Sequence, residues 1–300
     1  MPLTIEQVIE QIPSWADQSL KVSPLGGGLT NSIFRVDVGG VLFVVRIPGA
    51  STELLAVDRV NEHFNTRAAA EAGICPKVAH FLPDENVIVL EFIQADTMTI
   101  EQLQQPGLPT RMAQSLKQLH AGPRFLHEFN MFRLTEQYLQ ITEQREIRIP
   151  EDFRSYLPKV AQIEAVFKQR PLPTVPCHND LLAGNYMDDG QKLWLIDFEY
   201  SGNNDPTFEL GNTCQEQQFN EEQIVEMCTA YFGKADDDKL ARMQLNMIMS
   251  DVGWCLWAAI QASISTIEFD YWKWAVERWG RATAKMDSSD FNLWLQVVAQ

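Results

Sequence analysis

Residues 177–212, CHNDLLAGNYMDDGQKLWLIDFEYSGNNDPTFELGN, decide the fold and function that this sequence predicts. They contain a His-x-Asp-x-x-x-x-Asn run, formed by His178, Asp180 and Asn185, followed by an apolar, strand-like segment that ends in Asp197. The Asp-Gly step at residues 189–190 is typical of a hairpin turn. The pattern therefore predicts that one short loop and the end of one strand carry their polar side chains to the same cleft.

This order of residue types fits phosphoryl transfer, in which the protein mainly positions the reactants and neutralises charge. We expect Asp180 to face the hydroxyl group of an acceptor, and Asn185 and Asp197 to hold a magnesium ion (Mg2+) that bridges the nucleotide phosphates. A single His-x-Asp or Asp-Phe pair is too common to indicate catalysis, so the prediction rests on the complete set. For His178 we favour a role in bracing the loop over proton transfer.

The segment resembles the choline/ethanolamine kinase family, a branch of the group with a protein-kinase-like fold that includes aminoglycoside phosphotransferases. Protein kinases would have His-Arg-Asp and Asp-Phe-Gly, whereas residues 178–180 are His-Asn-Asp and residues 197–199 are Asp-Phe-Glu. The resemblance runs from residue 25 to about residue 281. It implies an α+β, bilobal fold. Residues 1–92 would form a small nucleotide-binding lobe with an antiparallel sheet and one long helix, and residues 93–300 a larger, mostly helical lobe for catalysis and acceptor binding.

Composition excludes several other classes. The 300 residues are 45% hydrophobic and 21% charged, as in ordinary soluble globular proteins. A formal net charge of −16 argues against a nucleic-acid partner, because no surplus of basic residues is available to neutralise phosphates. The five cysteines are scattered, which indicates a reducing, cytoplasmic compartment. The apolar residues 247–264 are interrupted by Asp251 and Gln261, so we expect a buried helix and no membrane insertion.

The N-terminal part predicts a sheet. Residues 33–38 and 41–47 flank Gly39-Gly40, a strong hairpin signal, and residues 77–82 and 87–91 predict a second hairpin. Helices are expected at residues 4–12 and 53–72. Gly28 and Asn31, near the glycine-rich residues 26–28, are expected to approach the nucleotide phosphates. A simple strand-entry turn explains this stretch equally well.

Arg46 ends the second of these strands. The resemblance implies that a residue there grips the nucleotide phosphates, and a guanidinium group can do so with paired hydrogen bonds. The resemblance also implies that Glu62, on the long helix, pairs with Arg46 and fixes its direction. Without the resemblance, Glu62 would be interpreted as a solvated helix acid. Residues 92–96 would connect the lobes and receive adenine.

The rest of the chain is predicted to be largely helical, at residues 109–121, 132–146, 151–169, 206–218, 221–232, 237–265 and 270–298. Trp254 and Trp257 share one helical face, and Trp274 lies on the next helix. Spacing alone favours a core role for these rings. In choline kinases, similar rings form a pocket for a quaternary ammonium group, and the resemblance adds Tyr200 and Glu216 as residues that approach the cation.

We therefore predict a phosphotransferase that moves the γ-phosphoryl group of ATP, with Mg2+, to the hydroxyl group of choline to give phosphocholine. Ethanolamine and thiamine stay open as acceptors. A catalytically silent, choline-binding pseudokinase is the alternative from another class. Among partners, the prediction includes only ATP and a small amino alcohol, and the resemblance allows a homodimer.

Overall fold

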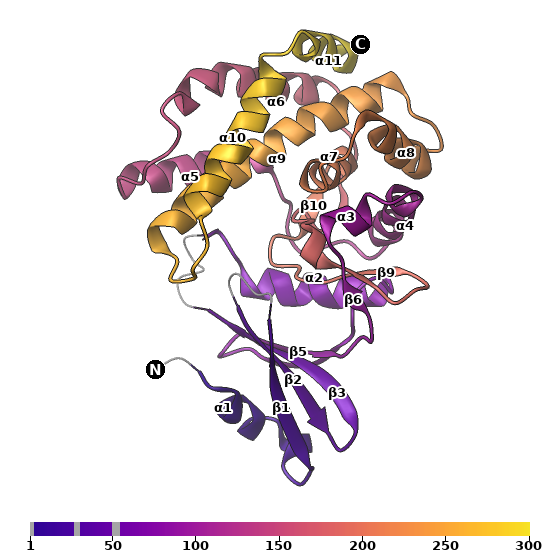
Figure 1. Ribbon diagram of the computed structural model, residues 1–300, viewed down its shortest axis with the longest axis vertical. Helices are drawn as coiled ribbons and strands as arrows, with labels where there is room; N and C mark the ends of the chain where they lie inside the picture. Colours follow the sequence, from indigo (N-terminus) through magenta and orange to yellow (C-terminus); the bar gives the residue numbers. More distant parts are fainter. Residues whose placement is uncertain (1–2, 27–30, 50–54) are drawn as a thin grey trace.

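The computed structural model describes residues 3–26, 31–49 and 55–300. Its strands lie mostly at one end and its helices at the other (Figure 1). The strands are β1 (Leu20–Leu25), β2 (Asn31–Val38), β3 (Val41–Pro48), β4 (Val78–Leu82), β5 (Val87–Glu91), β6 (Asp96–Thr97), β7 (Val175–Cys177), β8 (Tyr186–Asp188), β9 (Leu193–Leu195) and β10 (Gly202–Asn204). The helices are α1 (Ile5–Glu10), η1 (Pro13–Trp15), α2 (Arg59–Glu71), α3 (Ile100–Leu103), α4 (Leu108–His120), α5 (Met131–Gln144), η3 (Phe153–Tyr156), α6 (Leu157–Gln169), η4 (Ala183–Asn185), α7 (Pro206–Glu216), α8 (Glu221–Phe232), α9 (Asp237–Ile264), α10 (Tyr271–Met286) and α11 (Asp290–Ala299).

The large sheet has the strand order β1-β2-β3-β5-β4, and all its neighbouring strands are antiparallel. The two predicted hairpins are confirmed as β2–β3 and β4–β5. Gly39 and Gly40 both have positive φ, which a two-residue turn of this type requires. Strand β1 was not expected from the sequence, and it pairs with β2 along its whole length.

Alternation along β3 determines where Arg46 points. Val45 and Ile47 are buried against α1 and η1 in the core of the sheet. Because successive side chains of a strand point to opposite faces, Arg46 faces the other side, toward α2. The sheet therefore delivers one cation to the space between itself and the helices.

Helix α2 is shorter than the predicted helix at residues 53–72. It begins after Asp58, whose side chain accepts hydrogen bonds from the N–H groups of Val60 and Asn61, and residues 53–54 lie outside the described residues. A polar face of α2 is buried: Asn61 and Asn65 both donate to the carbonyl oxygen of Ser201, at 2.9 and 3.0 Å. Helix α2 lies between the sheet and the helices in Figure 1. These bonds join it to residues 177–212, the stretch that contains Asp180 and Asp197.

Helix α9 runs through the helical part and is covered by α5, α7, α10 and α11. It is long and apolar enough to cross a membrane, but 83% of its apolar window is buried inside the fold. That burial is expected of the core helix of a soluble protein. All five cysteines are free and buried.

Two predicted helices are each divided. The segment 270–298 forms α10 and α11, which are separated at residues 287–289, where Ser288 binds the carbonyl oxygen of Lys285 through its hydroxyl group. Short polar side chains of this kind compete with helical hydrogen bonds. The segment 151–169 forms η3 and then α6, which has Pro158 in its first turn, where a missing N–H is tolerated.

Candidate active site

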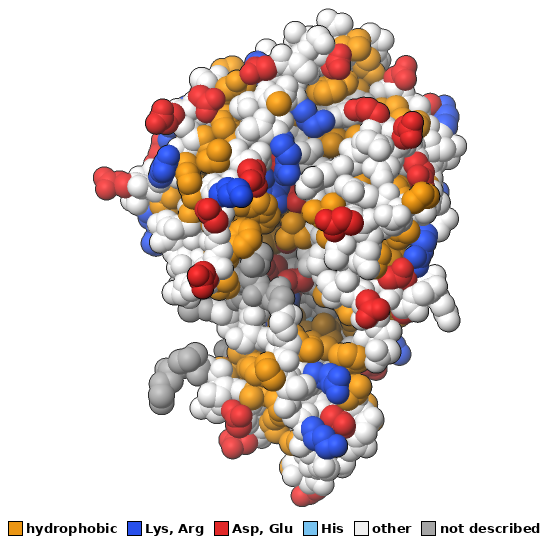
Figure 2. Space-filling model, in the orientation of Figure 1, with side chains coloured by type: hydrophobic (Ala, Val, Ile, Leu, Met, Phe, Trp, Pro, Cys, Tyr) orange, Lys and Arg blue, Asp and Glu red, His pale blue; other side chains and the backbone are white. Residues whose placement is uncertain are grey.

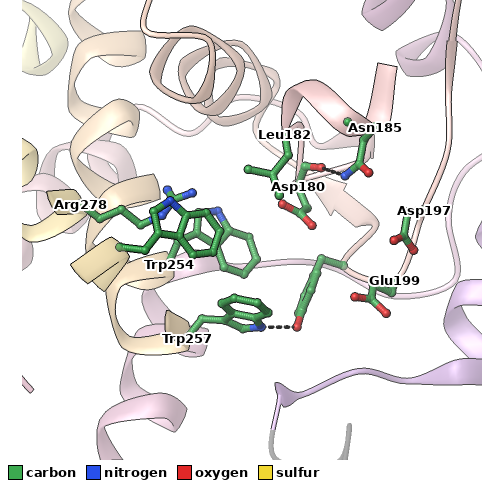
Figure 3. A pocket seen from close by; sticks show the side chains of 11 residues that line it. Asp180, Leu182, Asn185, Asp197, Glu199, Trp254, Trp257 and Arg278 are labelled. Atoms are coloured by element: carbon green, nitrogen blue, oxygen red, sulfur yellow. Dashed lines mark hydrogen bonds between the residues drawn. The ribbon is translucent and has the colours of Figure 1, made fainter. Parts of the chain in front are cut away.

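The catalytic stretch runs from β7 through η4, β8 and β9 to β10. Strands β8 and β9 pair as the predicted hairpin around residues 189–190. Two non-glycine residues in it have positive φ, Asn179 at 68° and Asp197 at 69°. Asparagine and aspartate tolerate this conformation better than other side chains. The two bends turn Asp180 and Asp197 toward one cavity (Figure 3).

Helix α7 fixes the loop that carries Asp180. The buried carboxylate of Glu209 accepts hydrogen bonds from the backbone N–H groups of His178 and Asn179, at 2.7 and 2.8 Å. Asn212 accepts one from Leu181 at 3.0 Å. The sequence analysis did not identify these two α7 residues, since their role depends on packing against a segment about 30 residues earlier.

The cavity has a volume of about 230 Å³ and lies between residues 180–200 and helices α9 and α10. Figure 2 shows a hollowed face on which hydrophobic and acidic side chains meet. It is lined by Asp180, Leu182, Gly184, Asn185, Asp197, Glu199, Tyr200, Trp254, Trp257, Trp274 and Arg278. Most of the predicted site residues are therefore brought together around it. Arg46, Glu62 and Asn31 lie beside it, and Gly28 is outside the described residues.

His178 is buried and braces the loop. Its Nε2–H donates to the carbonyl oxygen of Ile196 at 2.8 Å, and its Nδ1 accepts from the N–H of Asp180 at 3.3 Å. Burial lowers the pKa of His178 and favours the neutral ring that this pattern needs. The geometry supports the interpretation of His178 as a structural residue.

Asp180 is surrounded by negative charge. Burial raises its pKa well above the ordinary value, the carboxylates of Glu216, Asp197 and Glu199 raise it further, and Arg278 opposes the change. A carboxylate with a raised pKa is a stronger base and suits proton acceptance from a hydroxyl group.

Oxygen donors for a metal ion gather next to Asp180. Asn185 donates from its side-chain nitrogen to the carbonyl oxygen of Asp180 at 2.7 Å, an orientation that leaves its amide oxygen for a ligand. The carboxylate oxygens of Glu62, Asp197 and Glu199 lie within 4.8 Å of one another. Amide and carboxylate oxygens are the hard ligands that magnesium prefers, so this donor set fits the ion.

A chain of ion pairs crosses from the sheet to the catalytic stretch. Arg46 contacts Glu62 and Asp197, which confirms the expected pair and shows that Glu62, fully buried, is not a solvated helix acid. Arg59 binds Glu62 at 2.7 Å and Glu199 at 3.1 Å. Arg59 and Glu199 were not predicted as site residues from the sequence. The position of Arg59, three residues before Glu62 on one helix, was a usable signal.

Arg59 also donates to the side-chain oxygen of Asn31 at 3.3 Å. Burial lowers the pKa of Arg59, and Glu199 opposes this change. Asn31 is therefore connected to the same group of charges as Arg46, although it begins strand β2.

Aromatic rings form the opposite side of the cavity. Trp257 donates from Nε1 to the hydroxyl oxygen of Tyr200 at 2.6 Å, which fixes both rings. Tyr200 and Trp254 lie edge to face at 5.0 Å, and Trp257 and Trp274 at 5.8 Å. All four rings line the cavity; Tyr200, Trp254 and Trp257 also belong to the buried core, and Trp274 packs against it.

Glu216 was expected to approach the cation, but it is not among the residues that line the cavity. Both its carboxylate oxygens bind the guanidinium group of Arg278, at 2.6 and 2.8 Å, and Arg278 takes the position on the cavity wall. Glu216 therefore lies behind Arg278 and not on the cavity wall. Arg278 lies four residues after Trp274 on α10 and stacks on its ring at 4.2 Å, a helical spacing that could have drawn attention to it.

The comparisons with known proteins agree with this geometry. Residues 22–237 match the family described as choline/ethanolamine kinase. Protein LicA of Haemophilus influenzae is 26% identical over 249 residues, which cover 78% of this chain and 72% of that protein. Human ethanolamine kinase 1 is 28% identical over 310 residues, covering 90% and 68%. A choline/ethanolamine kinase family protein from Mesorhizobium loti has a crystal structure that matches with a TM-score of 0.86 and 32% identity, covering 97% of this chain and 96% of that chain.

Proposed function

Because the chain belongs to the choline/ethanolamine kinase family and has its protein-kinase-like fold, we propose that it transfers the γ-phosphoryl group of ATP to the hydroxyl group of choline. The general reaction, phosphoryl transfer from ATP to a small amino alcohol, is that of the family. The product of the proposed reaction is phosphocholine.

The observation that carries the choice of choline is the group of four rings opposite Asp180. A quaternary ammonium group has no N–H donors, so it gains mainly from aromatic faces, at roughly 0.5 to 2 kcal/mol for each ring. Trp254, Trp257, Trp274 and Tyr200 offer such faces, and the Tyr200 hydroxyl oxygen is already used by Trp257. A cation held there would place its hydroxyl arm toward Asp180.

The resemblance supports the remaining roles, together with the placement of the described residues in and beside the cavity. Asp180 orients or deprotonates the attacking hydroxyl group. Asn185 and Asp197 hold magnesium, which supplies charge neutralisation to the phosphates when bound. Arg46, held by Glu62, binds phosphate oxygens, and Asn31 and Gly28 approach the nucleotide as the resemblance implies.

Several further proposals accompany this one. We place the protein in the cytoplasm without membrane insertion, divide it into lobes at residues 92 and 93, and keep a homodimer as a prediction. Ethanolamine is the main alternative acceptor, because several of the similar proteins are named ethanolamine kinases. Thiamine and a silent choline-binding pseudokinase are further alternatives.

The test is magnesium-dependent turnover of ATP, measured as ADP release, with choline, ethanolamine, thiamine, an aminoglycoside or no acceptor. We expect turnover with choline to exceed that with every other acceptor, and to stop when EDTA removes the metal. Preference for ethanolamine would overturn the choice of choline and keep the family reaction. Choline binding without turnover of any acceptor would favour the pseudokinase.

A further inference from the structure

Arg278 has an unusual position for a cation. It lines the cavity that we assign to an ammonium group, yet its side chain is only 1% exposed. Its guanidinium group lies 4.2 Å from the centre of the Trp274 ring and makes paired hydrogen bonds to Glu216. Figure 3 shows Arg278 beside Trp254 on the aromatic side, across the cavity from Asp197 and Glu199.

The charges behind Arg278 balance one another. Arg278 also lies 3.4 Å from Asp251, and Asp251 in turn binds Arg281 and accepts a hydrogen bond from Gln215 at 2.5 Å. The two carboxylates and two guanidinium groups form a neutral cluster behind the wall, in which Arg278, Glu216 and Asp251 are buried and Arg281 is partly exposed. A cluster of this kind keeps its geometry, because separating one member would leave a buried charge without a partner.

The bond between Arg278 and Glu216 affects how different amines can bind. A primary ammonium group brings N–H donors that each need an acceptor once water is removed, and a carboxylate is the strongest acceptor available. A trimethylated nitrogen has no such need. Both oxygens of Glu216 accept from Arg278, and Glu216 is not among the residues that line the cavity, so the wall offers aromatic faces and a guanidinium group at this point instead of an anionic acceptor.

We propose that Arg278 is a specificity-determining residue that favours quaternary over primary ammonium acceptors by holding the Glu216 carboxylate behind the cavity wall. The inference rests on the proposed function, because it concerns the acceptor end of the same site. It reverses the role expected for Glu216, whose carboxylate serves to fix Arg278 and does not contact the substrate.

The experiment compares four acceptors that differ only in N-methylation: ethanolamine, its monomethyl and dimethyl derivatives, and choline. We measure kcat/KM for each with the full-length protein and with Arg278→Met. Releasing Glu216 should help ethanolamine most and choline least, and the ratio of choline to ethanolamine should fall by about tenfold, the effect of one charge-assisted hydrogen bond. An equal change for all four acceptors would overturn the proposal.

Two further variants separate this effect from general damage. In Arg278→Met/Glu216→Gln the released carboxylate is gone, so the ratio should return toward that of the unmodified protein. Arg281→Met is the matched control, because it removes a cation from the same cluster and the same helix without touching Glu216. A shift in Arg281→Met as large as that in Arg278→Met would also overturn the proposal.

Arg278→Lys covers the case in which Arg278→Met does not fold. It keeps the charge and loses the paired geometry, so the ratio should fall by a smaller factor in the same direction. If the unmodified protein phosphorylates none of the four amines, the proposed function fails. In that case calorimetry measures the dissociation constants of the same four amines. The role of Arg278 is then tested by comparing the preference for choline over ethanolamine between the unmodified protein and Arg278→Met.

Discussion

The two ends of the cavity are built differently. The end that we assign to the phosphates has Asp197 and Glu199 on the cavity wall, with the charged residues Arg46, Arg59 and Glu62 beside the cavity and joined to them in a chain of ion pairs. The acceptor end consists of four rings and one arginine, mostly from α9 and α10: Tyr200, Trp254, Trp257, Trp274 and Arg278. Asp180 lies between them (Figure 3).

The difference shows which end can change and which is already formed. The side chains of Arg46 and Asp197 are 12% and 31% exposed, and they join the sheet to the catalytic stretch. A magnesium ion on Asp197 would share this carboxylate with Arg46, so we expect the contact between Arg46 and Asp197 to change when the ion binds. Trp254 and Trp257 are only 4% and 6% exposed and are held by neighbouring rings, so the acceptor end is preformed.

The largest expected effect comes from Asp180→Asn, where the two ends meet. The amide cannot accept the hydroxyl proton, and kcat should fall by about a thousandfold, within the range for loss of a positioned base. The dissociation constants of ATP and choline, measured by calorimetry, should stay close to those of the unmodified protein. If turnover were retained, Asp180 would not be the group that accepts the hydroxyl proton, and no catalytic group would be identified between the two ends.

Arg46→Met tests the phosphate end alone. Losing charged hydrogen bonds to phosphate oxygens should lower kcat/KM for ATP by about 10- to 100-fold. The KM for choline should not change, because the acceptor end is separate. Glu62 still binds Arg59 at 2.7 Å, so we expect the fold to persist. Lys21→Met, on the exposed edge strand of the same sheet, is the matched control, and an equal loss there would show that Arg46 acts only through the sheet.

Trp274→Leu tests the acceptor end alone. Removing one aromatic face should raise the KM for choline by about tenfold at most, and leave the KM for ATP unchanged. The control is Trp272→Leu, two residues away on α10, because the Trp272 ring stacks with Arg148 and does not line the cavity. If both variants raised the KM for choline equally, the rings would return to a core role.

The sequence predicted the parts of the site that belong to compact motifs. Asp180, Asn185 and Asp197 lie within one short stretch, so their order was enough to bring them to one cavity. Arg59 and Arg278 were missed because their partners, Glu199 and Glu216, lie 140 and 62 residues away in the sequence. Pairing between residues so far apart depends on how the helices and strands pack, and the spacing of residues along the sequence gives no information about that packing.

The fold shows the same limit. The hairpins with paired glycines or a clear turn were predicted correctly. Strand β1 was missed because its alternation lasts only from residue 20 to residue 23 before Pro24, a residue that is tolerated in an edge strand such as this one. The helix predicted from residue 53 begins six residues later because Asp58 caps it. Apolar runs in the sequence therefore predicted that a helix or strand exists. Its first and last residues depend on local caps and turns.

The smallest expected effect comes from His178, which braces the loop that carries Asp180 between the two ends of the cavity. Burial holds the pKa of His178 below its ordinary value of 6.5, so the unfolded chain takes up a proton first as the pH falls. Stability is therefore lost as the pH falls from 6.5 toward the lowered pKa, by at most about 1.4 kcal/mol per pH unit for one histidine. Urea unfolding at pH 7.5 and 5.5 should show a smaller loss for His178→Asn than for the unmodified protein. Burial also lowers the pKa values of His63 and His80, but these contribute equally to both proteins. An identical loss in the two proteins would mean that the loop carrying Asp180 is not the acid-sensitive link between the two ends.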